Sequence, residues 1–188
     1  MFNRRIWTLS CYITALVTCS LLSAEESKEV EVKAIKLQVP ESWEQQPASN
    51  RLRLAQFAIK PVEGETEAEI VVYSFGGGGG GVTANVGRWV KQFEAEGREV
   101  KVVQGKAPAG EYVLVDIAGT YNKPVGPPIR QQTERTPDSR MLAAIIQIPN
   151  EGNYFLKLTG GKKTVEKQVE NFRKSFKADK DSEKPYEQ

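Results

Sequence analysis

Residues 140–158, "RMLAAIIQIPNEGNYFLKL", decide the fold. Two apolar runs, 140–148 and 153–158, flank Pro149-Asn150-Glu151-Gly152, and residues of this kind between two strand-like runs indicate a hairpin turn. Strands joined by so short a connection run antiparallel. The sequence therefore predicts an antiparallel pair here, and the remaining elements are placed around it.

Five further runs are strand-like. Residues 30–43 alternate apolar and polar positions and stop at a proline, and residues 68–75 are almost continuously apolar, as in a strand covered on both faces. The apolar parity changes within residues 51–60, which predicts a bulge near Ala55. The other two runs are "VKVVQG" at 100–105 and "YVLVDIAGTY" at 112–121.

Two stretches carry apolar residues at helical spacing. The first follows the glycine run, with Thr83 as its expected N-cap and Gly97 as its expected stop. The second, "TVEKQVENFRKSF" at 164–176, has Thr164 at its cap. One apolar stripe lets each helix cover one face of a sheet. The stripes are Val86, Trp89, Val90 and Phe93 in the first helix, and Val165, Val169, Phe172 and Phe176 in the second.

The element order is three strands, a helix, four strands and a helix. It predicts a single α+β domain over residues 25–178, with a largely antiparallel sheet and helices packed on both faces. Asn122–Ser139 is polar and proline-rich, and we expect a long loop there. Residues 179–188 are highly charged, and we expect a disordered tail.

The first 24 residues have the anatomy of a secretory signal peptide. Arg4 and Arg5 precede an uncharged apolar run, which ends in small residues at Ala24. We expect export to the periplasm or the medium after cleavage near Ala24. An uncleaved anchor and acylation at Cys19 are the alternatives, although Thr18 is a poor residue to precede an acylated cysteine. Membrane attachment would require this segment.

Missing side chains restrict the chemistry of the mature chain. It has no histidine, and both cysteines, Cys11 and Cys19, lie in the signal segment. These absences exclude Ser-His-Asp and Cys-His catalysis and most zinc sites. Loss of residues 1–24 leaves 24 basic and 24 acidic residues, so there is no basic excess for nucleic acid. We expect no catalytic residue, metal or cofactor.

Six glycines, 76–81, stand between a strand and a helix. Any such run satisfies G-x-G-x-x-G, but the lysine and hydroxyl of a phosphate loop are missing, since Gly81 is followed by Val82 and Thr83. A sharp turn with positive φ is the main interpretation, and an anion-binding loop is the alternative. The candidate ligand residues are Gly78, Gly79, Gly80 and Gly81, with Arg88, Arg130, Arg135 and Arg140 as a positive patch.

Asp116 is the one aspartate within an apolar strand run, and a buried carboxylate needs partners. We expect a structural aspartate held by arginine or tyrosine, with a catalytic acid as the alternative. A carboxylate-dependent hydrolase would need two acids converging in one cleft. Trp89, on the first helical stripe, should be buried, and Trp43 should lie in the core or at a groove edge.

"LQVPESW" at 37–43, the mid-chain helix and the closing "VENFRKSF" at 169–176 resemble PsbP/Mog1-like domains over residues 30–177. The resemblance implies an α/β/α sandwich and an accessory or binding role, with no shared catalytic residues to carry over. The glycine run resembles uncharacterised exported bacterial proteins. We therefore expect a non-catalytic binding module of the bacterial envelope, whose partner is an envelope protein or an anionic ligand. Its expected contact surface is one sheet end, bearing the glycine run and the loop 122–139.

Overall fold

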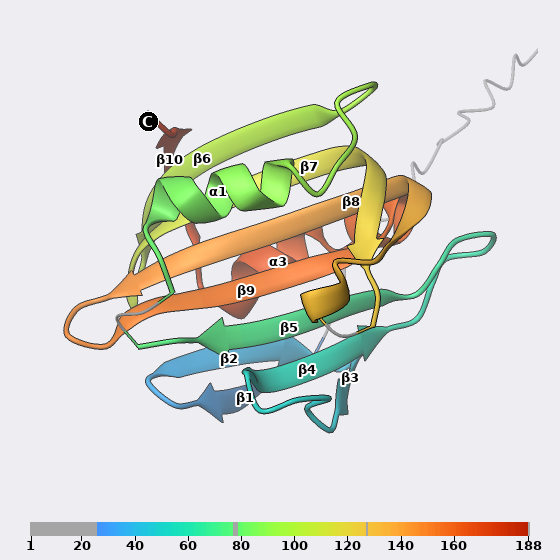
Figure 1. Ribbon diagram of the computed structural model, residues 1–188. Helices are drawn as coiled ribbons and strands as arrows, with labels where there is room; N and C mark the ends of the chain where they lie inside the picture. Colours follow the sequence, from blue (N-terminus) through green and yellow to red (C-terminus); the bar gives the residue numbers. More distant parts are fainter. Residues whose placement is uncertain (1–25, 77–78, 127, 188) are drawn as a thin grey trace, which may run out of the picture.

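The computed structural model describes residues 26–76, 79–126 and 128–187 of the protein (Figure 1). The predicted signal peptide, the predicted cleavage site and Gly78 lie outside these residues. Within them, no helix has both the length and the apolar character needed to cross a bilayer.

An eight-stranded antiparallel sheet, in the order β10-β6-β7-β8-β9-β5-β4-β3, forms the frame, and a separate hairpin, β1–β2, packs against it. The predicted antiparallel sheet and the predicted turn at 149–152 are confirmed, because β8 and β9 pair from Ile148–Gly152 onwards. The strands are β1 Ser27–Val32, β2 Ile35–Pro40, β3 Trp43–Gln46, β4 Arg53–Ile59, β5 Ala68–Ser74, β6 Glu99–Ala107, β7 Gly110–Pro124, β8 Thr133–Ile148, β9 Gly152–Gly161 and β10 Asp179–Pro185. The helices are α1 Val82–Val90, the short 3-10 helix η1 Pro128–Arg130, α2 Lys162–Glu166 and α3 Val169–Ser175.

Alternation along the strands divides the core in two. On β7, Leu114 packs with Phe172 of α3 and with the β1–β2 hairpin, whereas Val115 packs with Trp89 of α1. We call these two sides of the sheet the hairpin face and the α1 face. Burial of each large apolar side chain contributes about 2 kcal/mol. The largely antiparallel sheet agrees with the prediction. The described helices are few and short, and strands of the hairpin share a face where only a helix was expected.

Turns and caps account for most of the differences from the predicted elements. Residues 30–39 are not one strand, because Lys33 adopts a φ of 52° and the chain reverses into the β1–β2 hairpin. Neither predicted threonine cap forms, since Gly81 and Gly161 are the N-caps of α1 and α2. The Glu65 carboxylate instead accepts hydrogen bonds from the first backbone N–H groups of α2.

Three further boundaries are settled by the structure. α1 ends at Val90, so Gly97, with a φ of 66°, belongs to the later turn before β6. The single C-terminal helix predicted over 164–176 is divided into α2 and α3 around Gln168. The predicted bulge near Ala55 is confirmed by a register shift between Arg53 and Ala55.

The expected disordered tail is wrong over Asp179–Pro185, which forms β10 beside β6. The Glu183 carboxylate accepts hydrogen bonds at 2.8 and 3.2 Å from Arg173 and one at 3.0 Å from the Tyr112 hydroxyl. Both partners of the ion pair are nearly buried. This local network of charge holds a segment that lacks the apolar pattern of a strand.

The expected long loop 122–139 is also wrong, because β7 continues to Pro124 and β8 begins at Thr133. The two strands pair across most of this extension, apart from a register shift between Gly119 and Tyr121. We call residues 120–139, with η1 at their tip, the arm. Figure 1 shows the arm turning away from the line of β7 and crossing in front of β9 and β5.

Candidate functional site: the cleft under the arm

The arm and the sheet enclose a cleft of about 450 Å³, which we call the arm cleft. Three stretches of sheet and one loop form one wall, and the two strands of the arm form the other. The cleft therefore exists because the arm folds over the sheet. Its lining residues are Arg53 of β4, Thr66 and Glu67 of the preceding loop, Ala68 and Glu69 of β5, Thr159 and Gly160 of β9, and Tyr121, Lys123, Glu134, Thr136 and Ser139 of the arm.

Lys157 of β9 does not line this cleft itself, but it contacts Tyr121, which does. Its Nζ donates to Gln92 Oε1 at 2.9 Å and to the Tyr121 hydroxyl at 3.4 Å, and it lies 5.5 Å from the centroid of the Tyr121 ring. No carboxylate among residues 26–76, 79–126 and 128–187 lies within 4.0 Å of this ammonium. A largely buried cation without an anion is costly.

Burial lowers the pKa of Lys157 from the ordinary 10.5 to about 8. The charge of Glu69 acts in the opposite direction, and the charge of Arg53 lowers the pKa further. Loss of solvation is the largest of these effects because the ammonium must give up water for one amide and one phenol. Near neutral pH the side chain is thus mostly a cation, with a larger neutral fraction than an ordinary lysine has.

Tyr121 occupies its place because the chain after α1 pairs with β7. A bridge joins Phe93 to Tyr121, and their rings lie 5.0 Å apart. The same pairing brings Gln92 to the Lys157 ammonium. Burial raises the pKa of Tyr121 to about 12, so the phenol remains a hydrogen-bond donor.

Arg53 supplies the second cation of the cleft. Its Nη1 lies 2.8 Å from Glu69 Oε1, while Gln56 donates to the other carboxylate oxygen of Glu69 at 2.9 Å. Within the part of the chain that the structure describes, Arg53 Nε and Nη1 are shielded from solvent and make no hydrogen bond of good geometry. Such donors are rare in folded proteins and are concentrated at functional or strained sites.

The charges of the cleft are unevenly placed. Lys123, Glu134 and Glu67 are exposed, so water screens them. Arg53, Lys157 and Glu69 are less exposed, and we call these three residues the cleft base. The base has two cations and one carboxylate, so an anion of the right size would complete its charge balance.

The predicted glycine site is arranged as a turn. Gly80 has a φ of 80°, and the Asn85 side-chain amide donates to the carbonyl oxygens of Gly79 at 2.9 Å and Gly81 at 3.0 Å. Arg88 in turn donates to Asn85 Oδ1 at 3.0 Å. Gly79, Gly80 and Gly81 thus direct carbonyl oxygens at a buried asparagine that anchors the start of α1.

The predicted arginine patch is not brought together. Arg135 is paired with Glu94 through hydrogen bonds of 2.8 and 3.1 Å, and Arg140 is paired with Asp116 through bonds of 2.8 and 2.7 Å. The second pair provides the arginine partner expected for a structural Asp116. Arg130 lies exposed on η1, at the tip of the arm.

The predicted common contact surface is also wrong, because its two loops lie at opposite ends of the sheet. Ser74, just before the glycine run, pairs with Tyr154 near the start of β9. Ser139, at the base of the arm, pairs with Gly161 at the end of β9. The glycine turn and the arm are therefore separated by the length of a strand.

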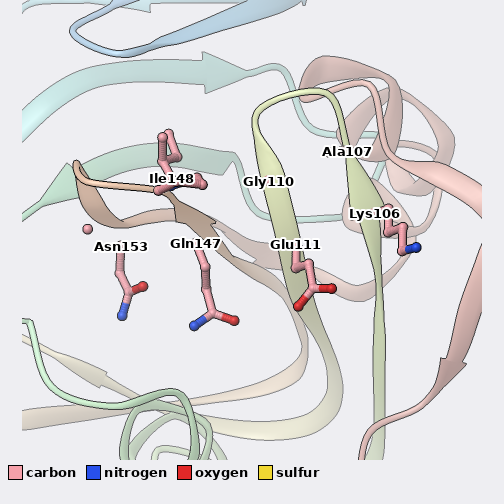
Figure 2. Close-up of a pocket in the computed structure, with 9 residues that line it drawn as sticks. Lys106, Ala107, Gly110, Glu111, Gln147, Ile148 and Asn153 are labelled. Atoms are coloured by element: carbon pink, nitrogen blue, oxygen red, sulfur yellow. The ribbon is translucent and has the colours of Figure 1, made fainter.

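A second hollow, of about 660 Å³, lies at the glycine end between the β6–β7 and β8–β9 turns. Figure 2 shows the side chains of Glu111, Gln147 and Asn153 extending in one direction, with Ile148 on the other side. Glu111, Gln147 and Lys106 are exposed, so their polar groups are satisfied by water. This hollow lacks the poorly solvated charges that make the arm cleft distinctive.

Sequence reasoning missed the cleft base. Lys157 stands alone among apolar neighbours in "NYFLKL", and an isolated lysine in a strand otherwise suited to burial was the available signal. Arg53 gave no comparable signal, because it begins a strand in a charged context.

No family model matches the chain, and no curated protein matches it. Among solved structures, the chain is similar to the solution structure of cyanobacterial PsbP (CyanoP) from Synechocystis sp. PCC 6803, with a TM-score of 0.49. The two sequences are 11% identical, and the match covers 91% of this chain and 99% of that chain.

Proposed function

We propose that the protein is a non-catalytic binding module of the bacterial envelope, and that the arm cleft holds a small anionic ligand. One observation carries the proposal: the Lys157 ammonium is largely buried and has no carboxylate within 4.0 Å among the described residues. Burial raises the free energy of the charged form of Lys157, which lowers its pKa. An incoming anion would offset that cost through its attraction to the ammonium.

The second cation favours the same ligand class. Arg53 shares its carboxylate partner, Glu69, with Gln56, and among the described residues two of its nitrogens lack hydrogen bonds of good geometry. Guanidinium groups bind carboxylates and phosphates through paired hydrogen bonds. An anion in the cleft would thus meet one ammonium, one guanidinium and the Tyr121 phenol.

The placement in the envelope is part of the proposal and is supported by the signal-peptide anatomy of residues 1–24. Membership of the PsbP/Mog1-like family, with an α/β/α sandwich, is likewise proposed, on the resemblance of residues 37–43 and 169–176. The anion site depends on neither point.

Thermal unfolding in the presence of acetate, phosphate or chloride tests the anion site. We expect acetate or phosphate to raise the melting temperature saturably at constant ionic strength, because a ligand that binds only the folded state stabilises it. Lys157→Met should abolish the effect, whereas the matched change at exposed Lys28 should leave it intact. An equal response of both variants, or no saturable response, would refute the anion site.

A carboxylate-dependent hydrolase is the rival function, and one observation favours it: Glu67, Glu69 and Glu134 all line the arm cleft. Two of these acids would have to act as acid and base or nucleophile. Hydrolysis of a chromogenic glycoside by the purified protein, lost in both Glu69→Gln and Glu134→Gln, would replace the binding proposal with this one.

A further inference from the structure

We infer that the Lys157 amine is a covalent docking point for a small aldehyde or keto acid, joined to the protein as an imine while Arg53 holds the carboxylate of the ligand. The inference rests on the proposed function, because it names the ligand class of the arm cleft.

The position of Lys157 suits a nucleophile. β9 is hydrogen-bonded to β8 on one side and to β5 on the other, so the backbone that carries the lysine is held on both edges. The side chain retains partial solvent exposure. Its Nζ is directed by the Gln92 amide and the Tyr121 phenol at 2.9 and 3.4 Å. A carbonyl carbon bonded to this nitrogen would place its oxygen beside the phenol.

Burial also supplies the reactive form of the amine, since only neutral nitrogen attacks a carbonyl. With a pKa of about 8, roughly one Lys157 side chain in ten is neutral at pH 7, against about one in several thousand for an ordinary lysine. Desolvation in an apolar setting is an established way of activating a lysine for imine formation.

The reaction is balanced without an oxidant or a reductant. The nitrogen lone pair attacks the carbonyl carbon, the C=O π electrons move to oxygen, and a proton moves from nitrogen to that oxygen to give a carbinolamine. The C–O bond then breaks, the oxygen leaves as water with a second proton from nitrogen, and the C=N bond forms. Tyr121 donates a hydrogen bond to the oxygen as negative charge develops on it.

Arg53 selects among carbonyl compounds. Its charge is close enough to lower the pKa of Lys157, and it lines the arm cleft together with Tyr121, which Lys157 contacts. Because guanidinium pairs with carboxylate, a carbonyl compound that carries a carboxylate should react faster than one of similar size that lacks it. Glyoxylate and acetaldehyde are two small probes that differ in this respect.

Reductive trapping tests the inference on the full purified chain. The protein is incubated near pH 7 with glyoxylate and cyanoborohydride, and the carboxymethylated lysines are located and timed by peptide mass spectrometry. We expect Lys157 to be modified at least about 10-fold faster than exposed Lys28, because of its larger neutral fraction. Equal rates at the two lysines in the wild-type protein would overturn the inference, whatever the variants do.

Variants test the two supporting residues. Tyr121→Phe keeps the ring and should slow trapping at Lys157 several-fold. Arg53→Gln should slow trapping by glyoxylate more than trapping by acetaldehyde, because it removes the carboxylate partner as well as a charge that lowers the pKa of Lys157. Lys157→Arg should leave the labelling of Lys28 unchanged. Equal trapping of glyoxylate and acetaldehyde by the wild-type protein would overturn the role of Arg53.

The outcomes separate this inference from the proposed function. A saturable rise in melting temperature with glyoxylate, without selective trapping at Lys157, would overturn the imine and leave the anion site standing. Uniform labelling of lysines together with no thermal response to glyoxylate, acetate or phosphate would overturn both.

Discussion

Replacement of Lys157 by methionine should change the pH dependence of folding in a direction that the structure dictates. Methionine has a similar length and no charge, so the variant removes one titration and keeps much of the packing. In the wild-type protein, burial lowers the pKa of Lys157 to about 8 in the folded state, against an ordinary value of 10.5. Below about pH 8 both states carry the charge, and the folded state bears the full cost of burying it.

The sign and magnitude follow from this difference. Between about pH 8 and the unfolded pKa, the unfolded state binds more protons than the folded state, so wild-type stability rises with pH. The full shift corresponds to about 3 kcal/mol. Because the side chain keeps some solvent exposure, the expected effect is smaller. We expect the unfolding free energy of the wild-type protein to rise by about 2 kcal/mol between about pH 7 and pH 10. The variant lacks this rise.

Urea unfolding followed by tryptophan fluorescence measures the effect, since Trp43 and Trp89 are both buried in the core. The quantity of interest is the difference in unfolding free energy between Lys157→Met and the wild-type protein. That difference should shift by about 2 kcal/mol in favour of the wild-type protein as the pH is raised. Lys28→Met should show no such shift, and a constant difference for Lys157→Met would refute the reasoning.

Two further sets of variants test parts of the fold that lie away from the cleft. Gly79→Ala should destabilise the protein by 1 kcal/mol or more, roughly, because a Cβ there would lie 2.9 Å from the Phe155 ring. Gly80→Ala should cost about 1 kcal/mol, because Gly80 has a positive φ. Gly81→Ala should be nearly neutral, because a Cβ there meets open space. Equal losses of stability in all three glycine variants, measured by urea unfolding, would contradict this turn. Glu183→Gln should cost about 3 kcal/mol, because it breaks a nearly buried ion pair with Arg173. Equal melting temperatures of Glu183→Gln and Glu187→Gln would show that this network does not hold β10.

The central part of the fold could be predicted from sequence because the apolar pattern there is strong. The turn at 149–152 joins two runs that are buried on both faces, and the parity change near Ala55 corresponds to a real register shift. Trp89 is buried on α1 as its helical spacing indicated. Asp116 has the arginine partner that a carboxylate in an apolar strand requires.

The arm, β10 and the contacts of Lys157 could not be predicted, because interactions other than an apolar pattern hold them. Prolines and polar residues suggested a loop at 122–139, but backbone pairing continues through them and forms the arm. β10 is highly charged, and Glu183 holds it through contacts with Arg173 and Tyr112. The tertiary fold alone brings Lys157 to Gln92 and Tyr121, so no local sequence pattern predicts their contact.

The titration of Lys157 itself tests the account most directly. In protein labelled with ¹³C at lysine Cε, the NMR shift of Lys157, assigned with Lys157→Met, can be followed against pH with and without acetate. We expect a midpoint near pH 8, in line with the pKa lowered by burial, and a higher midpoint in acetate, because a bound anion favours the ammonium. A midpoint near the ordinary 10.5 that acetate does not move would contradict both the desolvated cation and the anion site.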